Sequence, residues 1–183
     1  MARYFAGLDV STQSCKFVII DWDNHTLEYV GRVNYDEELP QYKTENGVAT
    51  GNELGVSESN PLMWIDAVEK VFKKTADSGF PMKYIKSISV SGQQHGLVAL
   101  DSSGNLARTM AKLWNDFSTQ EECDLLTEKM GGNDNMISET SNTQRTGYTA
   151  AKIYHMYRHE RDIYNLSLIH ISEPTRRYAI GES

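Results

Sequence analysis

The first twenty residues pair two strand-like segments around a short, hydroxyl-rich turn. Residues 4–10 and 15–21 are rich in aliphatic and aromatic side chains, which is typical of strands. Only four residues, 11–14, separate them, so the pair is predicted to form an antiparallel hairpin. A further strand is expected at residues 27–35, after another short polar turn. The chain is therefore predicted to begin as an antiparallel meander of three strands.

The next segments predict a crossover from this meander. Residues 36–60 are polar and without a sustained period, which indicates a long surface loop. Asn60 is expected to cap a helix that has Pro61 at its first position and ends near Asp77. Its apolar face is predicted to hold Met63, Ile65, Val68, Phe72 and Ala76. A strand near residues 84–91 would then return parallel to the first strand.

The remaining residues predict further elements that complete an α/β fold. A strand is expected at residues 97–101, and Ser118 with Glu121 forms a capping box for a helix that reaches Met130. A last helix should run from Thr149 to about Arg161. Three antiparallel strands, a helix and a parallel strand form the order of actin-like, ribonuclease H-like and hexokinase-type domains with a mixed sheet.

The first turn carries groups that could hold a phosphate. Backbone N–H groups of the turn, the hydroxyls of Ser11 and Thr12 and the ammonium of Lys16 can all donate to one anion. The carboxylate of Asp9, at the end of the strand, suits a magnesium ion that carries its own waters. The alternative is that Asp9 and Ser11 only cap a turn, as such residues often do.

A second polar segment lies eighty residues further along. Residues 93–96, Gln-Gln-His-Gly, lie between two predicted strands. A turn by itself does not require so many hydrogen-bonding side chains in a row. Such a group suits a polyol, whose hydroxyls need donors and acceptors at fixed angles.

These segments resemble the FGGY family of carbohydrate kinases and, within it, the xylulokinases. The resemblance covers residues 4 to about 165, and its motifs are Gly7–Gln13, Ser91–Gly96, Trp114–Asp116 and Thr146–Ile153, in the family's order. Two further segments without a catalytic motif, residues 36–44 and 59–64, are more similar to the animal enzymes than to the bacterial ones. The resemblance implies ATP-dependent phosphorylation of a ketopentose, D-xylulose to D-xylulose 5-phosphate, by the N-terminal half of a two-domain enzyme.

The resemblance also implies roles for single residues. Asp9 would hold Mg²⁺ through water and organise the phosphates of ATP. The implied phosphate-binding residues are Ser11, Thr12, Gln13 and Lys16, and the implied sugar-binding residues are Gln94, His95, Trp114, Asn115 and Asp116. For Tyr148 and Lys152, at the start of the last helix, we favour packing and dipole neutralisation instead.

The resemblance further implies that this polypeptide is incomplete. The family's catalytic aspartate and its second domain lie beyond the matching region, so we expect residues 1–165 to be a truncated N-terminal domain that is inactive alone. The full-length protein would supply the second domain in cis and could form a homodimer. Residues 166–183 depart from the family pattern and are expected to be a disordered tail or a sequencing artefact.

Composition excludes several partners. The net charge of −7 and the lack of a basic cluster argue against nucleic acid and anionic membranes, and no apolar run is long enough to span a bilayer. Cys15 and Cys123 form no disulfide framework, which favours a cytoplasmic setting. His155 and His159 lie four apart on a predicted helix, but no third metal ligand is near them in sequence, so an ordinary helix surface is preferred.

Three alternatives stay open. The substrate could be ribulose, gluconate, glycerol or fuculose, although Gln94-His95 differs from the Arg-Glu pair of glycerol kinases. The chain could be a sugar-binding fragment without catalysis. It could also lack a stable fold, because a truncated sheet leaves an unpaired edge and part of its core exposed.

Overall fold

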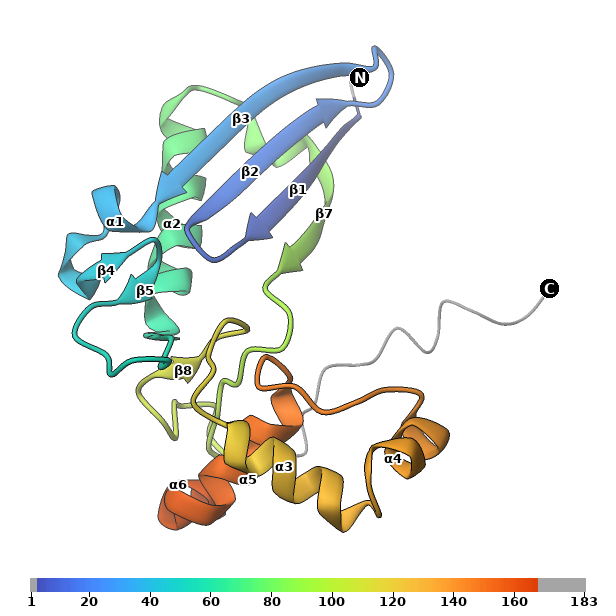
Figure 1. The fold of residues 1–183 in the computed structure, drawn as a ribbon. Helices are drawn as coiled ribbons and strands as arrows, with labels where there is room; N and C mark the ends of the chain where they lie inside the picture. Colours follow the sequence, from blue (N-terminus) through green and yellow to red (C-terminus); the bar gives the residue numbers. More distant parts are fainter. Residues whose placement is uncertain (1–2, 168–183) are drawn as a thin grey trace.

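The computed structural model describes residues 3–167, and Figure 1 shows their arrangement. The strands are β1 (Tyr4–Val10), β2 (Ser14–Asp21), β3 (Thr26–Asn34), β4 (Thr44–Glu45), β5 (Val48–Ala49), β6 (Glu58–Ser59), β7 (Ile85–Gly92) and β8 (Ala111–Lys112). The α-helices are α1 (Tyr35–Glu38), α2 (Leu62–Asp77), α3 (Gln120–Lys129), α4 (Asn133–Thr140), α5 (Thr149–His159) and α6 (Arg161–Leu166). Two 3₁₀ turns, Pro40–Tyr42 and Met82–Tyr84, complete the set.

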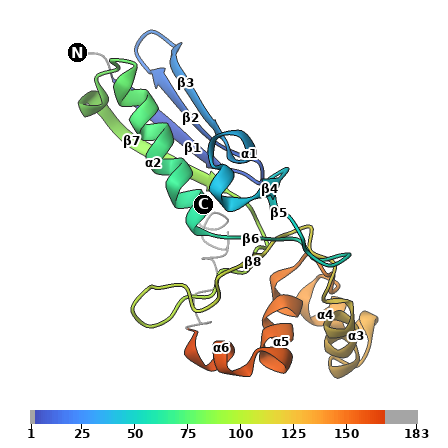
Figure 2. The ribbon, with the colours of Figure 1, turned by 90° about the vertical axis from the view of Figure 1, so that its left-hand side faces the viewer.

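The main sheet has the mixed topology that the sequence predicts. Its strand order is β3-β2-β1-β7, with β1, β2 and β3 antiparallel to one another and β7 parallel to β1. The crossover from β3 to β7 passes through α2, which lies along one face of the sheet (Figure 2). The structure is thus a mixed α/β sheet domain, consistent with the N-terminal part of an actin-like fold.

The core lies between the sheet and α2. Phe17 and Ile19 of β2 are fully buried on this side, where they meet Ala67 and Val71 of α2. The buried side chains of α2 are Met63, Ala67, Val71 and Thr75, four residues apart. The predicted face was therefore wrong at Ile65, which is 57% exposed, and at Ala76. At about 100° per residue, Ile65 projects about 200° away from Met63, toward solvent.

The start of α2 follows the expected cap with a small shift. The helix begins at Leu62, and the side-chain Oδ1 of Asn60 accepts a hydrogen bond from the Leu62 N–H at 3.0 Å. Asn60 therefore caps the helix, while Pro61 precedes its first residue.

The segment 36–60 lies mostly at the surface, as expected of a long surface loop, but it contains short regular elements that the sequence did not predict. Asn34 caps α1 by accepting from the Glu37 N–H at 3.1 Å, and Asp36 accepts from Thr44 Oγ1 at 2.7 Å. The segment folds back onto the first hairpin, where Gly47, at a φ of +77°, packs so closely on the Thr12 carbonyl that a Cβ would collide with it. Asp36 acts as a local anchor that periodicity does not reveal.

The second part of the chain is mainly helical. β8 pairs with β6, and α5 packs on both α3 and α6 (Figure 1). The predicted strand at residues 97–101 does not form, since only isolated bridges such as Leu97 to Lys112 occur there. The capping box was also wrong, because Ser118 donates its hydroxyl to Asp116 instead and leaves α3 without a side-chain cap. Helix α4 was not predicted.

The exposed edge of the sheet agrees with an expectation from the sequence. Among residues 3–167, β7 has one neighbouring strand, and its Ile88 and Val90 are 44% and 69% exposed. No helix within the described part of the chain has the length and apolarity needed to cross a membrane. Of the tail predicted at residues 166–183, Leu166 is the last residue of α6, and residues 168–183 lie outside the described residues.

Candidate functional site

A row of polar side chains crosses the sheet on the face opposite α2. The register places Ser91 beside Asp9, Asp9 beside Lys16, and Lys16 beside Arg32. Directly paired residues project from the same face of a sheet, and Phe17 next to Lys16 is buried on the other side. Ser91 Oγ donates to Asp9 Oδ1 at 3.0 Å. One carboxylate and two cations therefore share this end of the sheet.

The turn between β1 and β2 is held by several hydrogen bonds. The backbone N–H and the hydroxyl of Ser11 both donate to the Ser14 carbonyl, at 3.1 and 2.9 Å. The hydroxyl of Tyr35 donates to the Ser11 carbonyl at 2.9 Å from a fully buried position, and this burial raises the pKa of Tyr35. Turn capping by Ser11 is thus present, and it presents Thr12 to the neighbouring loop.

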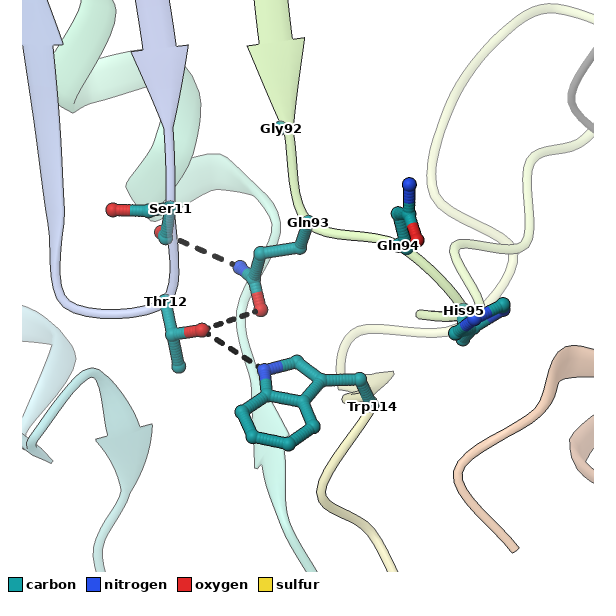
Figure 3. Close-up of a pocket in the computed structure, with 7 residues that line it drawn as sticks. All are labelled: Ser11, Thr12, Gly92, Gln93, Gln94, His95 and Trp114. Atoms are coloured by element: carbon teal, nitrogen blue, oxygen red, sulfur yellow. Dashed lines mark hydrogen bonds between the residues drawn. The ribbon is translucent and has the colours of Figure 1, made fainter. Parts of the chain in front are cut away.

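Thr12, in the turn between β1 and β2, contacts residues that follow β7 at a pocket of about 300 Å³. Its hydroxyl accepts from Trp114 Nε1 at 3.0 Å and donates to Gln93 Oε1 at 3.2 Å (Figure 3). The lining residues are Ser11, Thr12, Gly92, Gln93, Gln94, His95 and Trp114. Trp114 is half exposed. Its apolar ring lines the pocket together with amide, imidazole and hydroxyl groups.

The turn at His95 is supported by contacts with residues at the start of α5. His95 has a φ of +62°, a left-handed conformation, and its ring lies 4.8 Å from that of Tyr148 between centroids. The ammonium of Lys152 donates to the His95 carbonyl at 2.8 Å and to the Gly147 carbonyl at 2.6 Å. Lys152 is fully buried, and this desolvation lowers its pKa to about 8. The packing role expected for Lys152 and Tyr148 therefore includes support of His95. The expected dipole neutralisation was wrong, because Lys152 lies in the first turn of α5, where a cation opposes the helix dipole.

A second hollow of about 480 Å³ lies on the other side of Trp114. It is lined by Ser11, Thr12, Gln13, Ser14, Lys16, Arg32, Asn46, Val48, Trp114 and Asn115. Lys16 and Arg32 supply positive charge, and the turn supplies hydroxyls, which fits phosphate oxygens. Trp114 and Thr12 border both hollows, so a polar ligand and an anion could lie side by side here.

The structure does not bring every predicted site residue to the first pocket. Asp116 is fully buried, and its carboxylate accepts from the Ser57 N–H at 2.9 Å and from Ser118 Oγ at 2.6 Å. A direct sugar contact by Asp116 stays a prediction, and in this conformation the side chain instead ties the Trp114 loop to its neighbours. Asn115 faces the second hollow, with its Oδ1 buried and unpartnered among residues 3–167.

Arg32 and Gln93 are among the lining residues that the sequence did not predict. Arg32 could have been found only by extending the register of the first hairpin to the third strand, where it pairs with Lys16. Gln93 belongs to a polar segment that the sequence singled out, but Gln94 and His95 drew the functional prediction. Its hydrogen bond to Thr12 spans 81 residues, so no local pattern could indicate it.

Comparison with known proteins defines the class of this chain. Residues 4–170 match the N-terminal domain of the FGGY family of carbohydrate kinases, and the chain belongs to that family. The chain is 32% identical over 154 residues to a xylulose kinase of Haemophilus influenzae, covering 81% of this chain and 29% of that protein. It is 28% identical to xylulose kinase 2 of Arabidopsis thaliana, covering 87% and 32%.

A solved structure gives the same result at the level of the fold. The crystal structure described as a xyloylose kinase from Brucella ovis superposes with a TM-score of 0.75 at 26% identity, over 90% of this chain and 31% of that one. The chain thus spans about a third of the length of the relatives it matches. The closer similarity to animal enzymes stays a prediction, because plant and bacterial relatives also match.

Proposed function

We propose that this chain provides the sugar-binding and phosphate-orienting part of an ATP-dependent kinase that converts D-xylulose to D-xylulose 5-phosphate. The observation that carries the proposal is the pair of hollows that meet at Trp114, one lined by hydrogen-bonding side chains and one by cations. ATP would supply the phosphoryl group, and Mg²⁺ would offset the charge that develops on it. The names of the relatives support xylulose over other sugars of the family.

In this proposal the first pocket binds the ketopentose. Gln94 offers both a donor and an acceptor, and His95 offers a donor, an acceptor or both, which matches the hydroxyls of a sugar. Trp114 offers an apolar face for the carbon chain of the sugar. The left-handed turn at His95, held by Lys152, would keep these groups pre-oriented and so reduce the entropy that binding costs.

The phosphate side of the proposal rests on the polar row of the sheet. Asp9 uses Oδ1 to accept from Ser91, which leaves its second oxygen for a water of Mg²⁺. Lys16 and Arg32 would attract the phosphate oxygens, and the turn hydroxyls would direct them. These residues orient and neutralise the phosphate, which is most of what phosphoryl transfer asks of a protein.

We further propose that residues 1–183 bind sugar without completing the transfer. Within residues 3–167, neither hollow is lined by a carboxylate that could take the proton of the attacking hydroxyl. The base and a second domain in cis are therefore assigned to a longer form of the protein, in line with the greater length of its relatives. A homodimer of that form and a cytoplasmic location stay predictions.

Sugar binding by the 183-residue chain tests the proposal. Calorimetric titration with D-xylulose should give saturable binding, weaker for ribulose, gluconate, fuculose and glycerol. His95→Ala should lower the affinity by about tenfold or more, the scale of one buried polar contact. His25→Ala, in an exposed turn between β2 and β3, should leave affinity unchanged. Equal binding of all five compounds, or no binding, would contradict the proposed substrate.

The phosphate side is tested separately with ATP. Lys16→Met should weaken binding of MgATP by several-fold while leaving D-xylulose affinity unchanged, since the cation lines only the second hollow. Lys86→Met, an exposed lysine of β7 that lines neither hollow, is the matched control. Assays for ATP-dependent phosphorylation of D-xylulose should give no turnover above a protein-free blank.

A further inference from the structure

Three possible metal ligands converge between α3 and α5, away from the proposed sugar site. Glu122 lies in the first turn of α3, and His155 and His159 lie one turn apart on α5. One ligand atom from each of the three lies within 4.8 Å of the others, and the two imidazole centroids are 4.6 Å apart. The third ligand that the sequence did not reveal is therefore 33 residues away and is supplied by helix packing.

The burial of these groups points to a ligand rather than to a solvated surface. Glu122 is 1% exposed, so its carboxylate needs the compensating charge that Arg158 gives it in this structure. Nδ1 of His155 is buried and has no hydrogen-bond partner among residues 3–167, which leaves a lone pair or a proton unsatisfied. The side chain of His159 is 45% exposed and gives an ion a route from solvent.

We propose that Glu122, His155 and His159 form a binding site for one Zn²⁺ ion that joins α3 to α5. Two imidazoles and one carboxylate are a ligand set that zinc accepts, with the fourth position left to water. Ligand atoms around tetrahedral zinc lie about 3.3 Å apart, so the three ligand atoms must move together by on the order of 1 Å, through rotation of the two histidine side chains. The site is independent of the proposed kinase activity.

Arg158 sets the strength of this site. Its Nη1 donates to Glu122 Oε1 at 2.6 Å, and His159 Nε2 lies 3.0 Å from the same oxygen. Without an ion, the arginine therefore balances the buried carboxylate. A bound cation would compete with Arg158 for Glu122 and be repelled by its charge, so removing this charge should strengthen zinc binding.

Zinc titration of the purified 183-residue chain tests the proposal. A competing chromophoric chelator gives the affinity and the stoichiometry, and Co²⁺ as a substitute reports four-coordination by its visible absorption. We expect one ion per chain, with affinity lowered at least about tenfold by His159→Ala, by His155→Ala and by Glu122→Gln. Arg158→Gln should raise the affinity by several-fold, and His25→Ala should not change it.

The outcomes separate a built site from chance binding. Absence of one-to-one Zn²⁺ binding by the unmodified chain would overturn the proposal, as would unchanged affinity in His159→Ala, the variant least able to disturb folding because its side chain is nearly half exposed. If Glu122→Gln binds zinc as well as the unmodified chain, the two histidines bind alone and the three-ligand site is wrong. A Zn²⁺-dependent rise in melting temperature, present in His25→Ala and absent in His159→Ala, would support it independently of the chelator.

Discussion

The part of the chain up to Gly92 and the part after it are stabilised by different interiors. The main cluster of buried apolar side chains runs from Ala6 to Val71, between the sheet and α2. After Gly92 the buried apolar residues are mostly small or isolated, and the chain buries charged groups instead. These groups are Lys112, Asp116, Glu122 and Lys152, each 6% exposed or less, and Glu58 from the first part joins them at 8%.

This difference affects how each part can respond to its surroundings. Apolar burial is non-directional, so the sheet needs only the right volume and pattern. Buried charges need partners at fixed positions, such as Lys112 with Glu58 at 3.1 Å and Glu122 with Arg158 at 2.6 Å. The sugar pocket draws on both parts, since Thr12 comes from the sheet hairpin and His95 and Trp114 come from the charged part. Its geometry should therefore depend on pH more than the sheet does.

The largest effect is expected from Phe17→Ala in the apolar core. Phe17 is fully buried, with its ring 5.0 Å from that of Phe72 in an edge-to-face arrangement. Removing it should lower the free energy of unfolding by about 3–5 kcal/mol, measured by urea denaturation followed by circular dichroism. Val30→Ala, on the opposite and exposed face, should cost less than about 1 kcal/mol. Equal losses would show that the core does not lie on the α2 side alone.

Asp116→Asn should produce the next largest effect, confined to the second part of the chain. The substitution leaves Lys112 with one fewer anionic partner and weakens the bonds from Ser57 and Ser118. We expect a loss of about 2–3 kcal/mol in the stability of residues 93–167. Hydrogen exchange should show faster exchange there and unchanged protection in β1 and β2. Uniform loss across the chain would mean that the two parts unfold as one unit.

The pH dependence of stability should reveal Lys152. Burial lowers its pKa in the folded chain to about 8 from an ordinary value of 10.5. Between these values the unfolded chain binds more protons, so this residue makes stability rise with pH from about 8 to 10.5, by on the order of 1–3 kcal/mol. Subtracting the curve of Lys152→Met isolates the effect, because Cys15, whose burial raises its pKa to about 11, acts in the opposite direction and is present in both proteins. A flat difference curve would contradict the buried ammonium.

The smallest effect is expected from Lys73→Gln on the outer face of α2. Lys73 pairs with Asp77 at 2.9 Å, but the two side chains are 75% and 64% exposed. Solvent screens such a pair, so the loss should be at most about 0.5 kcal/mol in urea denaturation. A loss comparable to that of Asp116→Asn would remove the contrast between surface pairs and the buried charges of the second part.

The three N-terminal strands, α2 and β7 followed from the sequence because their signals are local. The apolar segments at residues 4–10 and 15–21 and the four-residue turn between them predict the hairpin, and Asn60 with Pro61 predicts the start of α2 within a residue. The polar segments around Asp9 and His95 were also visible as candidates for a site. In the second part, local signals gave two wrong predictions, which were a strand at residues 97–101 and a helix cap at Ser118.

The tertiary structure alone decided which of these polar groups meet. Arg32 joins Lys16 through strand register, Trp114 meets Thr12 across 102 residues, and Glu122 joins His155 and His159 only because α3 packs on α5. Asp116 stays a predicted sugar ligand, and only the tertiary structure reveals that its carboxylate accepts hydrogen bonds from the Ser57 N–H and from Ser118 Oγ. The physical reason is that periodicity and caps act over one or two turns of backbone, whereas a hydrogen bond or ion pair depends on where distant segments come to lie once the chain has packed.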